Sequence, residues 1–182
     1  LDLRGITIVV DYGHNVDALR ALLDALGHFP NERRIVVYSS AGDRRDSDII
    51  EQGRMLASQF DEAWLYEGDY VRGRRPGEIM ALITSGLNKL NGGSRTRRIE
   101  AVQGHLKAVD LALASARSGD LVMIQADTAE DFERGPHDAL AAGYGGDAVG
   151  IRLGFAARLA DLGDDVVRDA AGAGAVGVAA EV

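Results

Sequence analysis

The chain has 182 residues, a formal net charge of −8 and no cysteine. This length suffices for a domain with a full hydrophobic core, and the excess of acidic residues disfavours DNA or RNA as the main partner, because a nucleic-acid-binding face is basic. Disulfides and thiol catalysis are excluded, and without a signal-peptide pattern or an apolar run near ~18 residues we expect a cytoplasmic protein with no membrane partner.

Strand-like and helix-like segments alternate along the chain. Short apolar runs rich in β-branched residues predict strands at residues 6–10, 34–38, 63–66, 97–102 and 121–126. Between them, apolar residues at helical spacing predict helices that begin at Asn15 as N-cap, at Asp46 or Ser47 as N-cap, at Pro76 as first helical residue, and near Gly104. In the last of these helices, we expect Leu106, Val109 and Leu113 to face inward.

This alternation is typical of an α/β fold: a Rossmann-like, doubly wound, mostly parallel sheet with helices on both faces. A final helix over 129–142, interrupted at Gly135-Pro136, completes the domain, which we place at residues 1–142. Residues 143–182 are rich in glycine and alanine and are predicted to form an appendage, to which we assign no function.

Polar and charged side chains follow the predicted strands, whereas the connections from helix back to strand read as plain turns. The residues concerned are Asp11, His14 and Asn15, then Asp43, Arg44, Arg45 and Asp46, then Arg72, Arg74 and Arg75, and finally Asp127 and Thr128. Because the carboxyl ends of parallel strands meet at one edge of a sheet, these residues are expected to build a ligand site there.

Each motif also has a structural interpretation. Asp11 and His14 could bind a ligand or metal, or cap the first helix. Asp43 could bind a ribose and a neighbouring arginine a phosphate, or Asp46 could be an N-cap paired with Arg44. The guanidinium groups of Arg72, Arg74 and Arg75 lie within four residues, which favours a site that binds a ligand carboxylate, although solvated surface charge gives the same pattern.

Several catalytic signatures are absent from the sequence. It contains no G-x-x-x-x-G-K-[ST] phosphate loop, no G-x-G-x-x-G fingerprint, no G-x-S-x-G elbow and no H-E-x-x-H, and its four histidines lack ligand-like spacing. We therefore expect no self-sufficient catalytic centre and no metal site in this chain.

Four motifs resemble one family in order and spacing. The sequence DYGHN is similar to the D-Y-[AG]-H-N-P motif that opens the C-terminal domain of Mur ligases and their relatives, with Val16 in place of the proline. The GDRRD loop, the RGRRPGE loop and the SGDLVMIQAD strand follow in the order seen in cyanophycin synthetase-like ligases. The resemblance covers about Leu3 to Glu130.

The resemblance implies a role in ATP-dependent amide-bond formation. The P-loop and Mg²⁺ ligands lie in a central domain, so ATP with Mg²⁺ belongs to the complete enzyme and none is held by this chain alone. Such likeness places Asp11, His14, Asn15, Asp43 and Arg45 at the nucleotide. It assigns Arg44, Arg72, Arg74 and Arg75 to the amino-acid substrate, with no catalytic residue in this chain.

Three hypotheses follow. In the first, the chain is the C-terminal domain of an acid–amino-acid ligase, inactive alone and dependent on a central P-loop domain in the same polypeptide or a partner chain. In the second, it is a free-standing, non-catalytic module that binds a nucleotide or a small anionic metabolite. In the third, Asp11, His14 and Asp43 support a metal-assisted hydrolase.

Overall fold

The computed structural model of the protein describes residues 2–3, 5–13, 15–68, 71–89 and 93–126. The predicted helix over 129–142 and the predicted appendage over 143–182 lie outside the described residues, as do Asp127 and Thr128.

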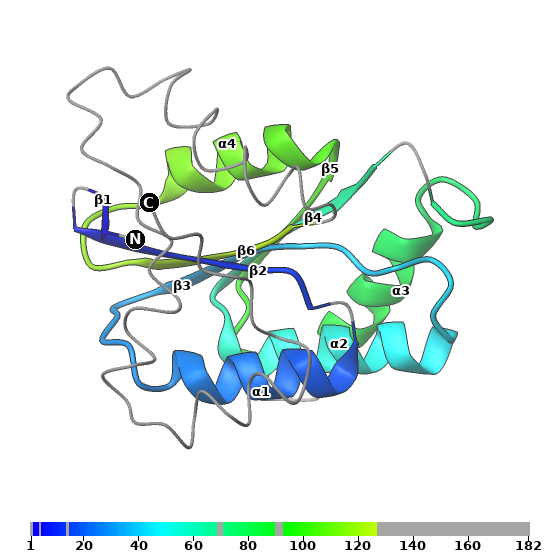
Figure 1. Cartoon of the computed structure of the whole chain (residues 1–182), viewed down its shortest axis with the longest axis horizontal. Coiled ribbons are helices and arrows are strands. Elements are labelled where there is room, and N and C mark those ends of the chain that lie inside the picture. Colours follow the sequence, from blue (N-terminus) through cyan, green and yellow to red (C-terminus); the bar gives the residue numbers. More distant parts are fainter. Residues whose placement is uncertain (1, 4, 14, 69–70, 90–92, 127–182) are drawn as a thin grey trace, which may run out of the picture.

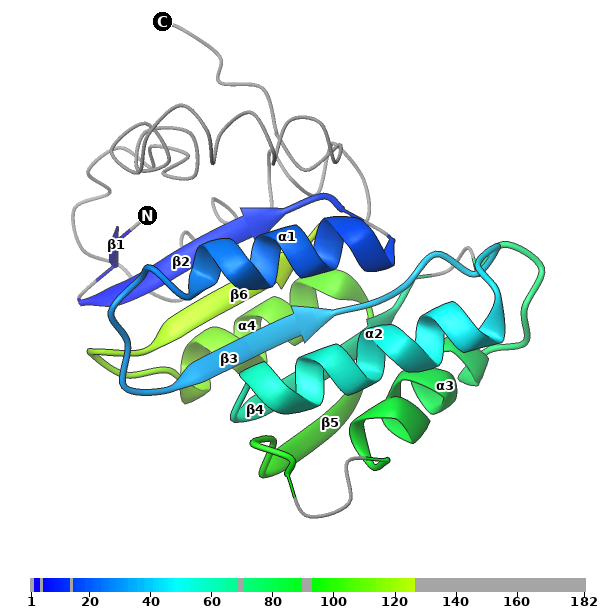
Figure 2. The ribbon, with the colours of Figure 1, turned by 90° about the horizontal axis from the view of Figure 1, so that it is seen from below.

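The described residues form a six-stranded sheet of order β1-β2-β6-β3-β4-β5 (Figures 1 and 2). The strands are β1 Asp2–Leu3, β2 Ile6–Asp11, β3 Arg34–Tyr38, β4 Glu62–Glu67, β5 Arg98–Gln103 and β6 Leu121–Gln125. All neighbours pair in parallel except β1, which is antiparallel to β2. The mostly parallel sheet is therefore confirmed, and β1 was not predicted because two residues carry no periodic signal.

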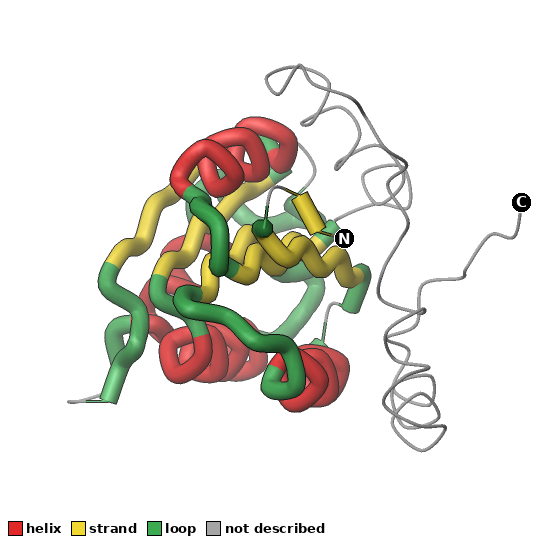
Figure 3. The backbone as a smooth tube through the Cα atoms, turned by 90° about the vertical axis from the view of Figure 1, so that its left-hand side faces the viewer, coloured by secondary structure: helices red, strands yellow, loops and turns green. Residues whose placement is uncertain are grey.

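Helices cover both faces of the sheet, as predicted. α1 (Val16–Leu26), α2 (Asp46–Gln59) and α3 (Glu78–Leu87) lie on one face, and α4 (His105–Ser115) lies on the other (Figures 1 and 3). The chain steps in one direction from β2 to β5 and then returns to insert β6 between β2 and β3. Because parallel crossovers are right-handed, the returning crossover places its helix on the opposite face.

The core has one apolar layer on each side of the sheet. Under α1, α2 and α3 it contains large buried side chains such as Leu22, Phe60 and Ile83, and under α4 it contains Ile35, Trp64 and Val109. Burial of these side chains is the main favourable contribution to folding.

The prediction that Leu106 faces inward is wrong, because its side chain is 44% exposed. α4 starts at His105, which is itself buried, and Leu106 lies ~100° around the helix axis from it. The inward positions of Val109 and Leu113 are confirmed.

Two glycines let α2 and α3 approach at backbone distance. A Cβ atom built on Gly53 would overlap the carbonyl oxygen of Ile83, and one built on Gly86 would overlap the carbonyl oxygen of Ile50. This contact fixes where α3 begins relative to α2, and so fixes the loops that precede both helices.

The helix starts differ from the sequence predictions at two of four positions. The start of α4 near Gly104 is confirmed, because Gly104 is its N-cap. The Asn15 cap is confirmed, because its side-chain oxygen accepts a hydrogen bond from Ala18 N at 2.8 Å. For α2, the prediction of Asp46 or Ser47 is wrong: the N-cap is Arg45, and the Asp46 carboxylate pairs with Arg74 instead of Arg44. α3 begins after Gly77, whose φ of 85° places it in the left-handed region, so Pro76 is not its first residue.

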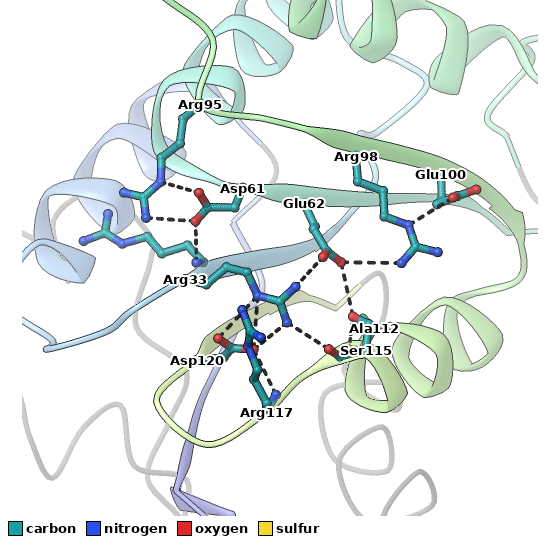
Figure 4. Close-up of polar contacts among 11 residues, drawn as sticks. Arg33, Asp61, Glu62, Arg95, Arg98, Glu100, Ala112, Ser115, Arg117 and Asp120 are labelled. Carbon is teal, nitrogen blue, oxygen red and sulfur yellow. Dashed lines mark hydrogen bonds and ion pairs between the residues drawn. The ribbon is translucent and has the colours of Figure 1, made fainter.

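A polar network joins the amino ends of the strands (Figure 4). The Arg33 guanidinium lies between the carboxylates of Asp120 and Glu62, at 2.6 and 2.5 Å, and also donates to the Ser115 carbonyl at 2.8 Å. The Asp120 side chain is fully buried. Replacing Arg33 by a neutral residue would therefore leave the Asp120 carboxylate as an uncompensated charge inside the protein.

Asp61 forms a second cluster at this edge, visible in Figure 4. Its carboxylate accepts hydrogen bonds from Arg95 Nε at 3.0 Å and from the backbone N–H of Arg34 at 2.8 Å. Burial by itself raises the pKa of Asp61, but these hydrogen bonds and the charge of Arg95 outweigh it, so the pKa is lowered.

We predict that Asp61 stabilises the fold at neutral pH and not in acid. Because its pKa is lower in the folded than in the unfolded chain, its contribution is complete above pH ~4 and is lost as the pH falls further. Asp61→Asn should lower the free energy of unfolding by about 1–3 kcal/mol at pH 7, with a smaller difference from wild type at pH 3. Urea unfolding, followed by the fluorescence of the single tryptophan Trp64, measures both values.

The control is Asp17→Asn, which removes an exposed pair with Arg20 and should cost under ~1 kcal/mol at pH 7. An Asp61→Asn deficit that stays constant down to pH 3 would contradict this account.

Candidate functional site

The polar loops 12–15, 39–45 and 68–77 leave the carboxyl ends of β2, β3 and β4. Because these strands run in the same direction, the loops emerge at one edge of the sheet (Figure 2). The helix-to-strand turns lie at the opposite edge, where they contribute Arg33 and Asp120 to the polar network and Asp61 to the second cluster described above. The expected gathering of the strand-end loops is therefore what the structure shows.

Asp11 is a buried carboxylate at the end of β2. Its side chain accepts a hydrogen bond from Gly13 N at 2.7 Å, which shapes the turn that leads into α1. Burial, together with the negative charge of Asp11, raises the pKa of Tyr38 at the end of β3, so the phenol stays protonated. His14, the third polar residue of this motif, lies outside the described residues.

Gln125, at the end of β6, joins the first two loops. Its side-chain oxygen accepts a hydrogen bond from Ser39 N at 3.1 Å, and its side-chain nitrogen donates to Gly13 O at 3.2 Å. Tyr66, at the end of β4, donates its hydroxyl to the Gln125 carbonyl at 2.8 Å. Because Gln125 is fully buried, these bonds are shielded from water and fix the loops relative to the sheet.

A groove of about 600 Å³ lies between the amino-terminal halves of α1 and α2. The wall formed by α1 contributes Asn15, Val16 and Asp17, and the other wall contributes Arg44, Arg45, Asp48, Glu51 and Gln52. The groove therefore brings together three of the residues predicted for the site: Asn15, Arg44 and Arg45.

The groove presents both signs of charge at its rim. Arg45 is exposed and pairs with Asp48 at 3.0 Å, and Glu51 pairs with Arg54 at 3.0 Å. Behind these residues Gln52 is fully buried, and neither its side-chain oxygen nor its nitrogen has a hydrogen-bond partner. Guanidinium and carboxylate groups on the same rim suit a small molecule that itself carries both charges.

Arg72 occupies an unusual backbone conformation in the third loop. Its φ of 50° lies in the left-handed region, which residues other than glycine rarely adopt. The guanidinium is partly exposed and contacts Asp43 of the second loop at 3.2 Å. Such backbone strain is concentrated at functional sites, and here it accompanies an arginine that retains free donors.

The other two arginines of this loop differ sharply. Arg75 is 91% exposed and has one long contact, to Glu78 at 3.5 Å. Arg74 is 13% exposed and bonds to the carbonyl oxygens of Gly42 and Arg44 and to the carboxylates of Asp46 and Glu78. The three guanidinium groups are therefore not equivalent, which their shared sequence motif gave no reason to expect.

The Glu67 carboxylate anchors the end of the third loop, where α3 begins. One carboxylate oxygen accepts hydrogen bonds from Ile79 N and Met80 N, at 3.0 and 3.2 Å, and the other accepts from Gly77 N at 2.6 Å. These are backbone donors at the start of α3, which have no partner within the helix. A buried side chain ten residues earlier in the chain thus replaces a local N-cap.

Sequence analysis did not identify Asp48, Glu51, Gln52, Glu67 or Gln125 as part of this edge. The spacing of Arg45, Asp48 and Gln52 places them on one side of α2, so that pattern could have indicated the groove wall. Glu67 and Gln125 carry no such signal, because each is a single polar residue at the end of an apolar strand.

Among the described residues, no three His, Asp or Glu side chains lie close enough together to hold a metal ion. In the same part of the chain, no helix has the length and apolar character needed to cross a membrane.

A family model described as "Mur ligase, glutamate ligase domain" matches residues 1–127. The chain belongs to this family. Cyanophycin synthetases of Synechocystis sp. and Trichormus variabilis are 36% and 33% identical to it over 116 residues, which is 64% of this chain. A Synechococcus UDP-N-acetylmuramoyl-L-alanyl-D-glutamate–2,6-diaminopimelate ligase is 32% identical over 126 residues.

This Mur ligase domain spans only 12–13% of the two cyanophycin synthetases and 24% of the Synechococcus ligase. Solved structures agree on the fold. A diaminopimelate ligase superposes with a TM-score of 0.54 at 20% identity, covering 69% of this chain and 24% of that one. A murein peptide ligase from Psychrobacter arcticus gives a TM-score of 0.59 at 16% identity, covering 82% and 30%.

We predict that Glu67→Gln destabilises the domain by about 1–3 kcal/mol, because the amide cannot accept all three backbone hydrogen bonds and its NH₂ group would face buried N–H donors. Urea unfolding followed by Trp64 fluorescence measures the loss. The matched control is Glu51→Gln, which removes one half-exposed ion pair and should change stability by under ~1 kcal/mol. Equal stability of the two variants would show that Glu67 does not anchor the third loop.

Proposed function

We propose that this chain is the amino-acid- and nucleotide-binding C-terminal domain of an ATP-dependent acid–amino-acid ligase that resembles cyanophycin synthetase. In this proposal the P-loop and the Mg²⁺ ligands belong to a central domain, supplied by the same polypeptide or by a partner chain. The isolated chain is then inactive in amide-bond formation.

One observation carries the proposal: three polar loops, two of them rich in arginine, emerge at one edge of the sheet, beside a groove whose rim has both guanidinium and carboxylate groups. An amino acid carries a carboxylate and an ammonium group, so such a rim can recognise both ends of it. The same exposed arginines suit the phosphates of a nucleotide.

Within this site the residues have separate proposed roles. Asp11, His14 and Asn15 are assigned to the nucleotide side, together with Asp43 at the ribose. Arg45 is placed toward the phosphate or the reacting groups, because it is exposed on the groove rim. The amino-acid substrate is assigned to Arg44, Arg72 and Arg75, whose side chains retain exposure and free donors.

The reaction in this proposal has two steps. The γ-phosphoryl group of ATP passes to a substrate carboxylate, and the amine of the incoming amino acid then attacks the acyl phosphate and releases inorganic phosphate. Fixed guanidinium groups at this edge bind and orient the anionic reactants, which places amine and acyl carbon within reach of each other. Neither step requires a nucleophile or a metal ligand from this chain.

The alternative is a free-standing module that binds a nucleotide or a small anionic metabolite without catalysis. The exposed arginines suit that role too. It differs in one measurable respect, because such a module binds its ligand tightly when isolated.

We predict that this chain, supplied with the central P-loop domain of a cyanophycin synthetase as a fusion or in trans, releases ADP only when the correct amino acid is present. Arg72→Gln should raise the amino-acid concentration for half-maximal ADP release by about tenfold or more, since a charged hydrogen bond to the substrate is lost. The measurement is a coupled ADP assay across a panel of amino acids.

Arg97→Gln is the matched control, because Arg97 is exposed at the opposite edge. No amino-acid-dependent ADP release in any such pairing, together with tight nucleotide binding by the isolated chain in calorimetry, would favour the free-standing module.

A further inference from the structure

Arg74 uses nearly all its hydrogen-bonding capacity inside the protein. Its Nε donates to Gly42 O at 2.7 Å, and its Nη2 donates to Arg44 O at 2.6 Å and contacts Asp46 Oδ1 at 2.8 Å. Its Nη1 donates to Glu78 Oε1 at 2.8 Å. A guanidinium group has five N–H donors, so at most one remains for anything outside these contacts.

The partners of Arg74 belong to two different loops. Gly42 and Arg44 lie between β3 and α2, whereas Arg74 and Glu78 lie between β4 and the first turn of α3. Without Arg74, the carbonyl oxygens of Gly42 and Arg44 would lose these donors, and the Asp46 carboxylate would lose its one ion-pair partner among the described residues.

The two loops also meet at backbone distance beside Arg74. A Cβ atom on Gly42 would overlap the carbonyl oxygen of Val71, so only glycine allows this approach. Next to this contact Arg72 pairs with Asp43 across the two loops. The left-handed backbone of Arg72 is therefore held by contacts on both sides of it.

We propose that Arg74 is a positioning residue, which joins the second and third loops into one unit and so sets the spacing between Arg72 and the pair Arg44 and Arg45. It then acts on ligand binding through these neighbours and does not itself contact the ligand. This assignment replaces the substrate contact that the arginine-rich motif suggested for Arg74, and it rests on the proposed function for the identity of the ligand.

Lysine cannot take this place. Its ammonium group keeps the positive charge but lacks the planar fork that reaches two carbonyl oxygens and two carboxylates at once. A residue that acted on a ligand through charge alone would tolerate lysine. Arg74→Lys therefore distinguishes a direct charge contact with the ligand from positioning of the two loops.

The first arm of the test needs no ligand. Amide hydrogen exchange is measured on the full chain for Arg44 N–H, which is bonded to Ala41 O at 3.1 Å. In Arg74→Gln and Arg74→Lys, exchange at Arg44 should become about tenfold faster. Arg75→Gln, which removes the same charge from the adjacent exposed residue, should leave it unchanged.

The second arm measures inorganic pyrophosphate affinity by calorimetry, with pyrophosphate as the anionic probe. Arg74→Gln, Arg74→Lys and Gly42→Ala should each weaken binding about tenfold, and Arg72→Gln should weaken it without changing exchange at Arg44. Gly42→Ala is informative because it separates the loops and alters no charge. Arg97→Gln, at the opposite edge, should bind like wild type.

Unchanged exchange at Arg44 in Arg74→Gln would overturn the proposal. So would faster exchange with unchanged pyrophosphate affinity, or full affinity in Arg74→Lys, which would make Arg74 a ligand contact. If wild type alone does not bind pyrophosphate, the free-standing anion-binding module is contradicted, and the exchange arm still decides whether Arg74 joins the loops.

Discussion

The insertion of β6 between β2 and β3 is the constraint on which the rest of the structure depends. This strand comes last among those described, yet it pairs in parallel with both earlier strands, and its final residue, Gln125, bonds to the loops that follow them. β6 thereby joins β2 to β3 within the sheet, and Gln125 aligns the first two strand-end loops. From there Arg74 and Glu67 extend the same alignment to the third loop.

The two edges of the sheet divide stability from recognition. At the amino edge, Arg33 and Arg95 are paired with the buried or half-buried carboxylates of Asp120 and Asp61. At the carboxyl edge, Arg45, Arg72 and Arg75 stay exposed with weak or solvent-accessible partners. Charge that is already neutralised stabilises the fold, whereas charge that remains accessible can bind an anion.

The alternation of strands and helices, the parallel sheet and the edge that gathers the polar loops could all be predicted from the sequence, because periodicity and strand ends are local features. The arrangement of the site could not. Arg33 and Asp120 are 87 positions apart, and Gln125 and Gly13 are 112 apart, so no local pattern marks these pairs. Nor can sequence distinguish Arg74 from Arg75, since only the folded loops show that one is enclosed and the other exposed.

The account's central claim is that the strand-end loops share one rim, and a single nitroxide label tests it most directly. Because the chain has no cysteine, Arg44→Cys gives one attachment point in the exposed second loop, and paramagnetic broadening of backbone amides then reports which segments lie near it. We predict strong broadening of amides in 15–17 and 71–78 and none in 28–33, 93–97 and 116–120. Broadening of the second group, with the first group unaffected, would contradict the account.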